Sequence, residues 1–223
     1  MLVSQDVLFI HPPKTGGLSV TQFLINNLPG EIIITVPEGH HSPSDKVRVM
    51  RGQRHENLPQ AEKWLKVLGR KLSDFKAIVA VIRNPYEIEV SQFYYLRLGY
   101  PHDQGPGQEI ALSGDFDRFC REVPYPHFGA RPIESWYTVN GASPSNLVLI
   151  RAENLVREMT DAIAQVCPIK KPMPHLNATQ HKDWREYVNS VNEPLIYAKY
   201  KWLYQFYERF RPGESGAHAD GAT

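Results

Sequence analysis

The sequence has little of what identifies a metal-binding, secreted or membrane-spanning chain. It contains only two cysteines, Cys120 and Cys167, and they match no metal-ligand spacing. No apolar run approaches the roughly 18 residues of a membrane span. The N-terminus has no basic region, and its apolar run is only as long as a strand, so it does not resemble a signal peptide. We therefore expect no bound metal, no membrane span and a reducing, cytoplasmic location.

An excess of charge of one sign is also missing. The net charge is +1 over 223 residues, which argues against a nucleic-acid partner or a membrane-coating surface, so any anion site must be local. Hydrophobic residues make up 42% of the chain, which is enough for a globular protein with a sizeable core. We predict a single domain over residues 1–211, followed by a disordered tail over 212–223.

The first stretch that suggests chemistry begins with a short apolar run. Residues 7–10 predict a buried strand, which ends at His11-Pro12-Pro13 because proline cannot donate to a sheet. The loop Lys14-Thr15-Gly16-Gly17 follows, and a helical pattern starts near Leu18. A glycine loop between a strand and a helix can hold a phosphate with its backbone N–H groups. The lysine precedes the glycines, so this is not a Walker A loop, and a structural corner with an exposed lysine is the alternative.

A second such stretch includes the most apolar strand pattern of the chain. Residues 75–82 predict a strand that is buried on both faces. Asn84 and Pro85 then have the residue types preferred at the start of a helix. Arg83 ends the strand and Ser91 lies two turns into the helix, so both can face one anion. Taken singly, Arg83 is equally typical of a surface ion pair, and Ser91 is equally typical of a helix serine that contacts no ligand.

The rest of the pattern alternates strands with helices, which predicts an α/β fold. We expect further strands over 31–36 and 146–150, a short helix from Ser44, and other helices over 18–28, 58–72, 115–123, 133–139, 155–166 and 192–210. The glycine- and proline-rich segment 97–114 predicts a loop, either a lid over an acceptor site or a surface excursion. If the strands at 7–10 and 31–36 are parallel neighbours, His40 and His41 emerge beside Lys14.

Together the two stretches resemble the segments with which one enzyme family binds its donor. Pro-Lys-Thr-Gly-Gly at 13–17, then a strand with Arg-Asn-Pro at 83–85 and a serine in the next helix, is similar to sulfotransferases that use 3′-phosphoadenosine 5′-phosphosulfate (PAPS). The likeness is to carbohydrate-type and bacterial members in particular. It implies a P-loop-like three-layer fold with a central, mainly parallel sheet flanked by helices. It also implies transfer of a sulfuryl group from PAPS, as co-substrate, to an acceptor hydroxyl without a metal.

The resemblance implies which residues of this chain contact the donor. These are Lys14, Thr15, Gly16 and Gly17 for the 5′-phosphosulfate, Arg83 and Ser91 for the 3′-phosphate, and Asn177 and Thr179 for a late loop that closes over the nucleotide. Many relatives have a hydroxyl where Leu18 stands, and Ser19 can supply that contact instead. Relatives often carry a second arginine where Ile88 stands. The late loop can also be interpreted as a glycosylation sequon.

Catalysis needs a base for the acceptor hydroxyl and a cation near the leaving oxygen. A histidine suits the first role because its pKa lies near neutral pH. The run from His41 to Ser44 resembles the histidine segment of carbohydrate-type and bacterial members, so we predict His41 as the base, with His40 as the open alternative. Lys14 is the predicted catalytic cation.

The acceptor is predicted from the family type alone. We expect a carbohydrate or a small natural product that offers a hydroxyl, and the sequence indicates no oligomeric state. Two other functions remain possible. A nucleotide-dependent phosphotransferase is disfavoured because the sequence lacks a Walker A loop and Mg²⁺-binding aspartate patterns. A non-catalytic nucleotide-binding module would keep the loop and show no turnover.

Overall fold

The computed structural model describes residues 1–40, 42, 44–176 and 181–207. The chain forms two compact units, called here the sheet unit (residues 1–82 and 134–178) and the helical unit (residues 83–133 and 179–223). Two compact units are compatible with one folding domain, so the single domain over 1–211 stays a prediction. The tail over 212–223 lies outside the described residues. Within the described ranges, no helix combines the length and the apolar character needed to cross a membrane.

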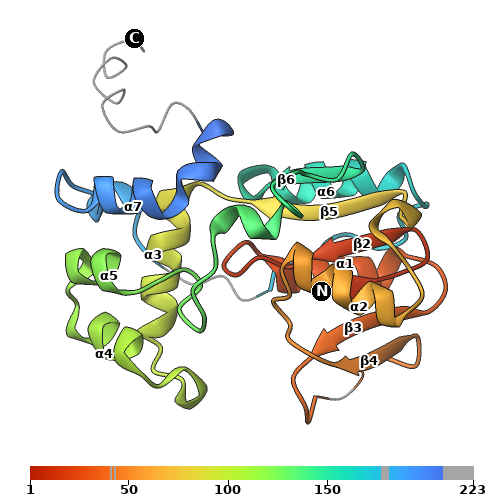
Figure 1. Ribbon diagram of the computed structural model, residues 1–223, viewed down its shortest axis with the longest axis horizontal. Helices are drawn as coiled ribbons and strands as arrows, with labels where there is room; N and C mark the ends of the chain where they lie inside the picture. The colour runs from red at the N-terminus through yellow and green to blue at the C-terminus, as the bar shows by residue number, and fades with distance from the viewer. Residues whose placement is uncertain (41, 43, 177–180, 208–223) are drawn as a thin grey trace. The chain divides into compact units, whose positions relative to one another are not determined.

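A mainly parallel sheet of six strands is the frame of the sheet unit (Figure 1). The strand order is β4-β3-β1-β2-β5-β6; β1 runs antiparallel to both of its neighbours, and the other pairs are parallel. The strands are β1 (Leu2–Val3), β2 (Val7–Ile10), β3 (Ile32–Val36), β4 (Val47–Arg51), β5 (Ala77–Ile82) and β6 (Leu147–Arg151). Every residue of β2 and β5 is buried, as expected for parallel strands covered on both faces.

Helices cover both faces of this sheet. Side chains of α1 and α6 form one apolar cluster with alternate strand residues such as Phe9 and Val79. The strand residues that face the other way, such as Leu8 and Ala80, are also fully buried, and α2 adds buried side chains that lie outside that cluster. The helices that accompany the sheet are α1 (Gly17–Asn27), α2 (Leu58–Val67), α6 (Leu155–Ala164) and the short 3₁₀ helices η1 (Leu72–Asp74), η3 (Ile133–Trp136) and η4 (Ala152–Asn154). The α/β fold with a central, mainly parallel sheet flanked by helices is thus confirmed.

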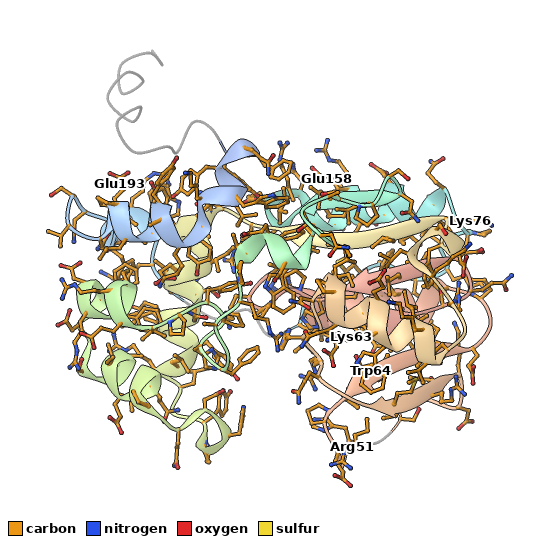
Figure 2. The ribbon with its side chains drawn as sticks, in the orientation of Figure 1. Arg51, Lys63, Trp64, Lys76, Glu158 and Glu193 are labelled. Atoms are coloured by element: carbon orange, nitrogen blue, oxygen red, sulfur yellow. The ribbon has the colours of Figure 1, made fainter. Side chains whose placement is uncertain are left out.

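Local hydrogen bonds fix the start of α2. The Asn57 side chain accepts from the Gln60 N–H at 3.2 Å, and the Gln60 side chain accepts from the Asn57 N–H at 3.0 Å. The ring N–H of Trp64, labelled on α2 in Figure 2, donates to buried Glu56 at 3.1 Å. These bonds hold the backbone immediately after His55, a residue that matters for the site described below.

The helical unit contains α3 (Pro85–Leu96), α4 (Pro106–Ser113), α5 (Phe116–Glu122), α7 (Glu193–Tyr200) and the 3₁₀ helices η2 (Pro101–Asp103), η5 (Trp184–Glu186) and η6 (Lys201–Gln205). Asn84 caps α3 as predicted, because its side chain accepts from the Tyr86 N–H at 2.9 Å. The ring of Phe93 on α3 lies 5.1 Å from the rings of both Phe116 and Phe119 on α5. Aromatic edge-to-face packing therefore joins α3 to α5.

The structure differs from several local expectations. The strands at 7–10 and 31–36 are parallel but are not neighbours, because β1 lies between them. Residues 47–51 form strand β4 instead of the helix expected from Ser44. The segment 97–114 is not one long loop, because it contains η2 and α4.

Candidate functional site

The segment that joins β2 to α1 has the backbone shape of an anion-binding loop. Lys14 and Gly16 have φ angles of 63° and 79°, in the left-handed region, on either side of Thr15. Alternation of this kind turns neighbouring N–H groups toward a common point, here at the positive end of α1. The Thr15 hydroxyl donates to the Pro12 carbonyl at 2.8 Å and braces the loop. The backbone N–H of Thr15, and not its hydroxyl, is therefore its candidate contact to an anion.

Two glycines allow this loop for different reasons. Gly16 has the positive φ, and a Cβ atom there would lie 2.9 Å from Cδ2 of Leu155. A Cβ atom on Gly17 would lie 1.9 Å from both Cδ2 and Nε2 of His11. Gly17 thus allows the His11 imidazole to lie against the first turn of α1. Lys14, Thr15, Gly16 and Gly17 share one loop at a helix N-terminus, and their contact with a phosphosulfate stays a prediction.

The hydroxyl of Ser19 is engaged by the backbone of Leu176. Ser19 is buried; its Oγ accepts from the Leu176 N–H at 3.0 Å and lies 3.5 Å from the Leu176 carbonyl oxygen. This contact joins the first turns of α1 to a segment far along the chain. A phosphate contact from Ser19, which stays a prediction, would have to share the hydroxyl with Leu176. The predicted donor residues Asn177 and Thr179, which follow, lie outside the described residues.

A pair of histidines, neither of them among the predicted site residues, lies next to the loop. The rings of His11 and His55 meet edge to face with centroids 4.4 Å apart, and Phe9 stacks on His11 at 5.7 Å. Nδ1 of His55 lies 2.9 Å from the backbone carbonyl oxygen of His11. A carbonyl oxygen can only accept, so Nδ1 of His55 carries the proton. In neutral His55 the lone pair that can take up a proton is then on Nε2.

Burial keeps both imidazoles neutral at physiological pH. It lowers the pKa of His55 to about 4; the hydrogen bond to His11 opposes this shift, and the charges of Arg54 and Lys14 add to it. Burial, and then the neighbouring His55, lower the pKa of His11 well below its ordinary value. The Lys14 charge is close enough to influence His55. The sheet unit therefore holds a neutral base with a defined accepting atom within electrostatic range of the loop lysine.

His40 lies in the turn segment that follows β3, and His41 lies outside the described residues. The His40 side chain is exposed, with Nδ1 3.2 Å from the Pro37 carbonyl oxygen. Although β1 separates β2 from β3, His11 and His40 line the same cavity, which has a volume of about 290 Å³. Its other walls come mainly from α1 and β3. The sheet unit therefore places two histidines, His11 and His40, on one pocket.

The second predicted anion segment belongs to the helical unit. The Arg83 guanidinium lies 3.0 Å from the Glu87 carboxylate, and these side chains are 23% and 24% exposed. Ser91, two turns into α3, is buried. A phosphate at Arg83 would have to share the guanidinium with Glu87 or displace that carboxylate. The common anion contact of Arg83 and Ser91 stays a prediction.

Two other kinds of reactive centre, a metal site and a reactive thiol, are not found among the residues that the structure describes. Among them, no group of three or more His, Cys, Asp or Glu side chains is arranged to hold a metal ion. Cys120 and Cys167 are both buried and carry free thiols. Burial raises the pKa of the Cys167 thiol, which disfavours the reactive thiolate form.

No protein-family model matches the chain, and no curated protein matches it. Among solved structures, the chain is similar to the crystal structure of mouse sulfotransferase SULT7A1 complexed with PAP. The match covers 95% of this chain and 87% of that chain, at 14% sequence identity and a TM-score of 0.49. The function proposed below is therefore argued from the residues of the chain itself.

Proposed function

We propose that this chain is a PAPS-dependent sulfotransferase that transfers a sulfuryl group to an acceptor hydroxyl. The observation that supports this most strongly is the juxtaposition, within the sheet unit, of an anion-type loop and a neutral histidine with a defined accepting atom. The Lys14 charge acts on His55, so both lie in one electrostatic environment. The sequence resemblance at 13–17 and 83–85 supplies the identity of the anion, a 3′-phosphorylated adenosine phosphosulfate.

The proposed donor site uses the loop for the 5′ end of the nucleotide. Backbone N–H groups of Thr15, Gly16 and Gly17 bind the 5′-phosphosulfate at the N-terminus of α1. Lys14 adds a full positive charge, which stabilises the oxygen that leaves sulfur. Arg83 and Ser91 bind the 3′-phosphate, and Asn177 and Thr179 complete the nucleotide site.

We assign the base to His55, with His41 and His40 as rivals. Nε2 of His55 takes the proton of the acceptor hydroxyl while the acceptor oxygen forms a bond to sulfur. The bond from sulfur to the 5′-phosphate oxygen breaks, and the nucleotide leaves as 3′-phosphoadenosine 5′-phosphate (PAP). Negative charge on the bound donor favours the imidazolium form, so it shifts the pKa of His55 upward from about 4 toward the working pH.

Calorimetric titration with PAP, and with AMP as the control that lacks the 3′-phosphate, tests the donor site. We expect PAP to bind at least tenfold more tightly than AMP. Lys14→Ala should weaken the binding of both nucleotides, and Arg83→Ala should remove the preference for PAP. Lys76→Ala is a matched control, because this lysine pairs with Asp6 at 3.2 Å and has no proposed role in binding. Equal or absent binding of the two nucleotides would overturn the proposal.

Measurements of turnover distinguish a sulfotransferase from the alternative functions. His55→Asn keeps a hydrogen-bond donor for the His11 carbonyl and removes the base, so we expect PAP binding to persist and sulfuryl transfer to fall at least a hundredfold. The same assay on His40→Ala and His41→Ala ranks the rival bases. Tight PAP binding with no transfer to any acceptor would favour a non-catalytic nucleotide-binding module. Phosphoryl transfer from ATP would favour the phosphotransferase.

A further inference from the structure

The cavity beside the loop has walls that suit an apolar molecule. Its volume is about 290 Å³, which corresponds to roughly ten water molecules and lies near the lower end of ligand pockets. Ile25, Ile34 and Val36 supply buried apolar wall surface, and Leu18 lies at the first turn of α1. A ligand of about 10 to 14 non-hydrogen atoms fills such a space, which is smaller than an oligosaccharide.

At Leu18 the chain departs from the family pattern, and the cavity gives a physical reason for this departure. Many relatives have a hydroxyl at this position, where it contacts the 5′-phosphate. Here the position is apolar and lines the cavity. A hydroxyl there would place a polar group in a wall that also includes Ile25 and Val36, so leucine exchanges a donor contact for an apolar wall.

Arg54 provides the cavity with a charged recognition group. It is half-buried, lines the cavity, and lowers the pKa values of both His11 and His55 by its positive charge. Among the residues that the structure describes, its guanidinium makes no ion pair or hydrogen bond. Its neighbour along the chain, Arg51, pairs with Glu38 at 2.8 Å. A half-buried arginine without a protein carboxylate is well suited to bind the carboxylate of a ligand through its planar fork.

We propose that this cavity is the acceptor site and that the acceptor is a compact, largely apolar hydroxy acid, such as an aryl hydroxy acid, whose carboxylate pairs with Arg54. The role as acceptor site rests on the proposed sulfotransferase function, and the binding preference does not. The acceptor hydroxyl then approaches the side of the cavity where His11 forms part of the wall, and the ring centroid of His11 lies 4.4 Å from that of the proposed base, His55. Of the two predicted acceptor classes, this favours the small natural product over the carbohydrate.

The test uses two probes of equal size that differ only in charge. Calorimetry measures the affinity of the full chain for 4-hydroxyphenylacetate and for 4-hydroxyphenylacetamide, with and without PAP. We expect the acid to bind at least tenfold more tightly than the amide. Arg54→Met should remove this preference and leave the affinity for the amide within about threefold. Arg51→Met is the matched control, because Arg51 does not line the cavity, and it should change neither affinity.

A second variant and a second readout make the result decisive. Ile34→Phe should fill the cavity and weaken the binding of both probes, while PAP binding persists. Equal affinity of the wild-type chain for acid and amide, or tighter binding of maltotriose than of either, would overturn the inference. So would an Arg54→Met variant in which PAP and both probes weaken together, since Arg54 would then serve the donor. Loss of PAP binding with the acid preference intact would instead count against the sulfotransferase function alone.

Discussion

The imidazole of His11 occupies the space that a side chain on residue 17 would need. A Cβ atom built on Gly17 would lie 1.9 Å from two ring atoms of His11, far inside any allowed contact. The glycine of the loop therefore has two consequences. In the proposed donor site it lets an anion approach the backbone, and in the structure it lets a buried histidine that follows β2 pack against the start of α1. The second consequence also positions the carbonyl group to which His55 donates.

Gly17→Ala should therefore destabilise the chain although it adds a good helix former. In the first turn of a helix, alanine in place of glycine ordinarily stabilises by up to about 1 kcal/mol. Here the clash must move His11 or α1, and we expect the free energy of unfolding to fall by about 2 to 4 kcal/mol, with loss of PAP binding. Urea unfolding measures the first and calorimetry the second.

Gly30→Ala is the control for this measurement. Gly30 has a φ of 70° and open space around its Cβ position, so the substitution strains the backbone without a clash. It should cost about 1 to 2 kcal/mol and leave PAP binding unchanged. An unfolding free energy for Gly17→Ala equal to or above that of the wild type would refute the contact with His11.

His11, which is buried, and His55, which is partly buried, predict a decrease in stability at acid pH. Each has a folded-state pKa below its unfolded value of 6.5, and that of His55 is about 4. Above about pH 6.5 both states are neutral and the stability is fully present. As the pH falls toward 4 the unfolded chain binds protons that the folded chain does not, at about 1.4 kcal/mol per pH unit and histidine.

His55→Asn measures the share of one histidine in this decrease. The variant keeps a donor for the His11 carbonyl and cannot titrate, so its unfolding free energy should fall less steeply between pH 6.5 and 4 than that of the wild type. Identical slopes for wild type and His55→Asn would show that the folded chain does not hold His55 in its neutral form.

The sequence predicted the frame of the fold because its strands and helices carry strong local signals. The apolar run before Arg83 and the cap at Asn84 are examples, and both appear as predicted. β1 was missed because a strand of two residues carries no period. β4 was mistaken for a helix because a capping residue was given more weight than the alternation of Val47 and Val49 with neighbouring polar residues. In 97–114, a proline at the start of α4 and a glycine after its end were the missed helix signals.

The candidate site could be predicted only where it is local in sequence. The loop from Lys14 to Gly17 is contiguous, so its residue types and order were enough to predict a glycine loop between a strand and a helix. His55 was missed because its meeting with His11 depends on how the sheet is paired, and no spacing in the sequence encodes that. The run Glu56-Asn57-Leu58-Pro59 marks the start of α2 but says nothing of what the histidine before it contacts.

A buried ion pair holds the helical unit together. The Glu89 carboxylate is fully buried; it accepts from the Lys199 ammonium group through one oxygen and from the Tyr200 hydroxyl, at 2.7 Å, through the other. Lys199→Met leaves this carboxylate buried without its cation, so we expect the free energy of unfolding to fall by about 3 to 5 kcal/mol. Thermal and urea unfolding both measure this loss.

Two comparisons identify burial as the cause. The Arg118–Glu122 pair has the same kind of partners, but its side chains are 51% and 42% exposed, so Arg118→Met should cost less than about 1 kcal/mol. Combining Lys199→Met with Glu89→Gln removes both charges and keeps an acceptor for Tyr200, and it should restore at least half of the lost stability. If Lys199→Met cost no more than Arg118→Met, the ion pair would contribute nothing beyond a surface pair.

Removal of the negative charge of Glu87 should increase the affinity of the chain for PAP. The Glu87 carboxylate lies 3.0 Å from the Arg83 guanidinium and thus competes with a 3′-phosphate for the same donors. Glu87→Gln keeps the size and the hydrogen-bonding capacity of the side chain and removes its charge. If the proposed donor site is correct, the variant should bind PAP about three- to tenfold more tightly than the wild type, with little change for AMP, because only PAP carries the phosphate that meets Arg83. Glu122→Gln, on α5, controls for the change in net charge. Equal tightening of PAP and AMP would indicate a general electrostatic effect, and weaker PAP binding would mean that Glu87 orients Arg83 for the phosphate and does not compete with it.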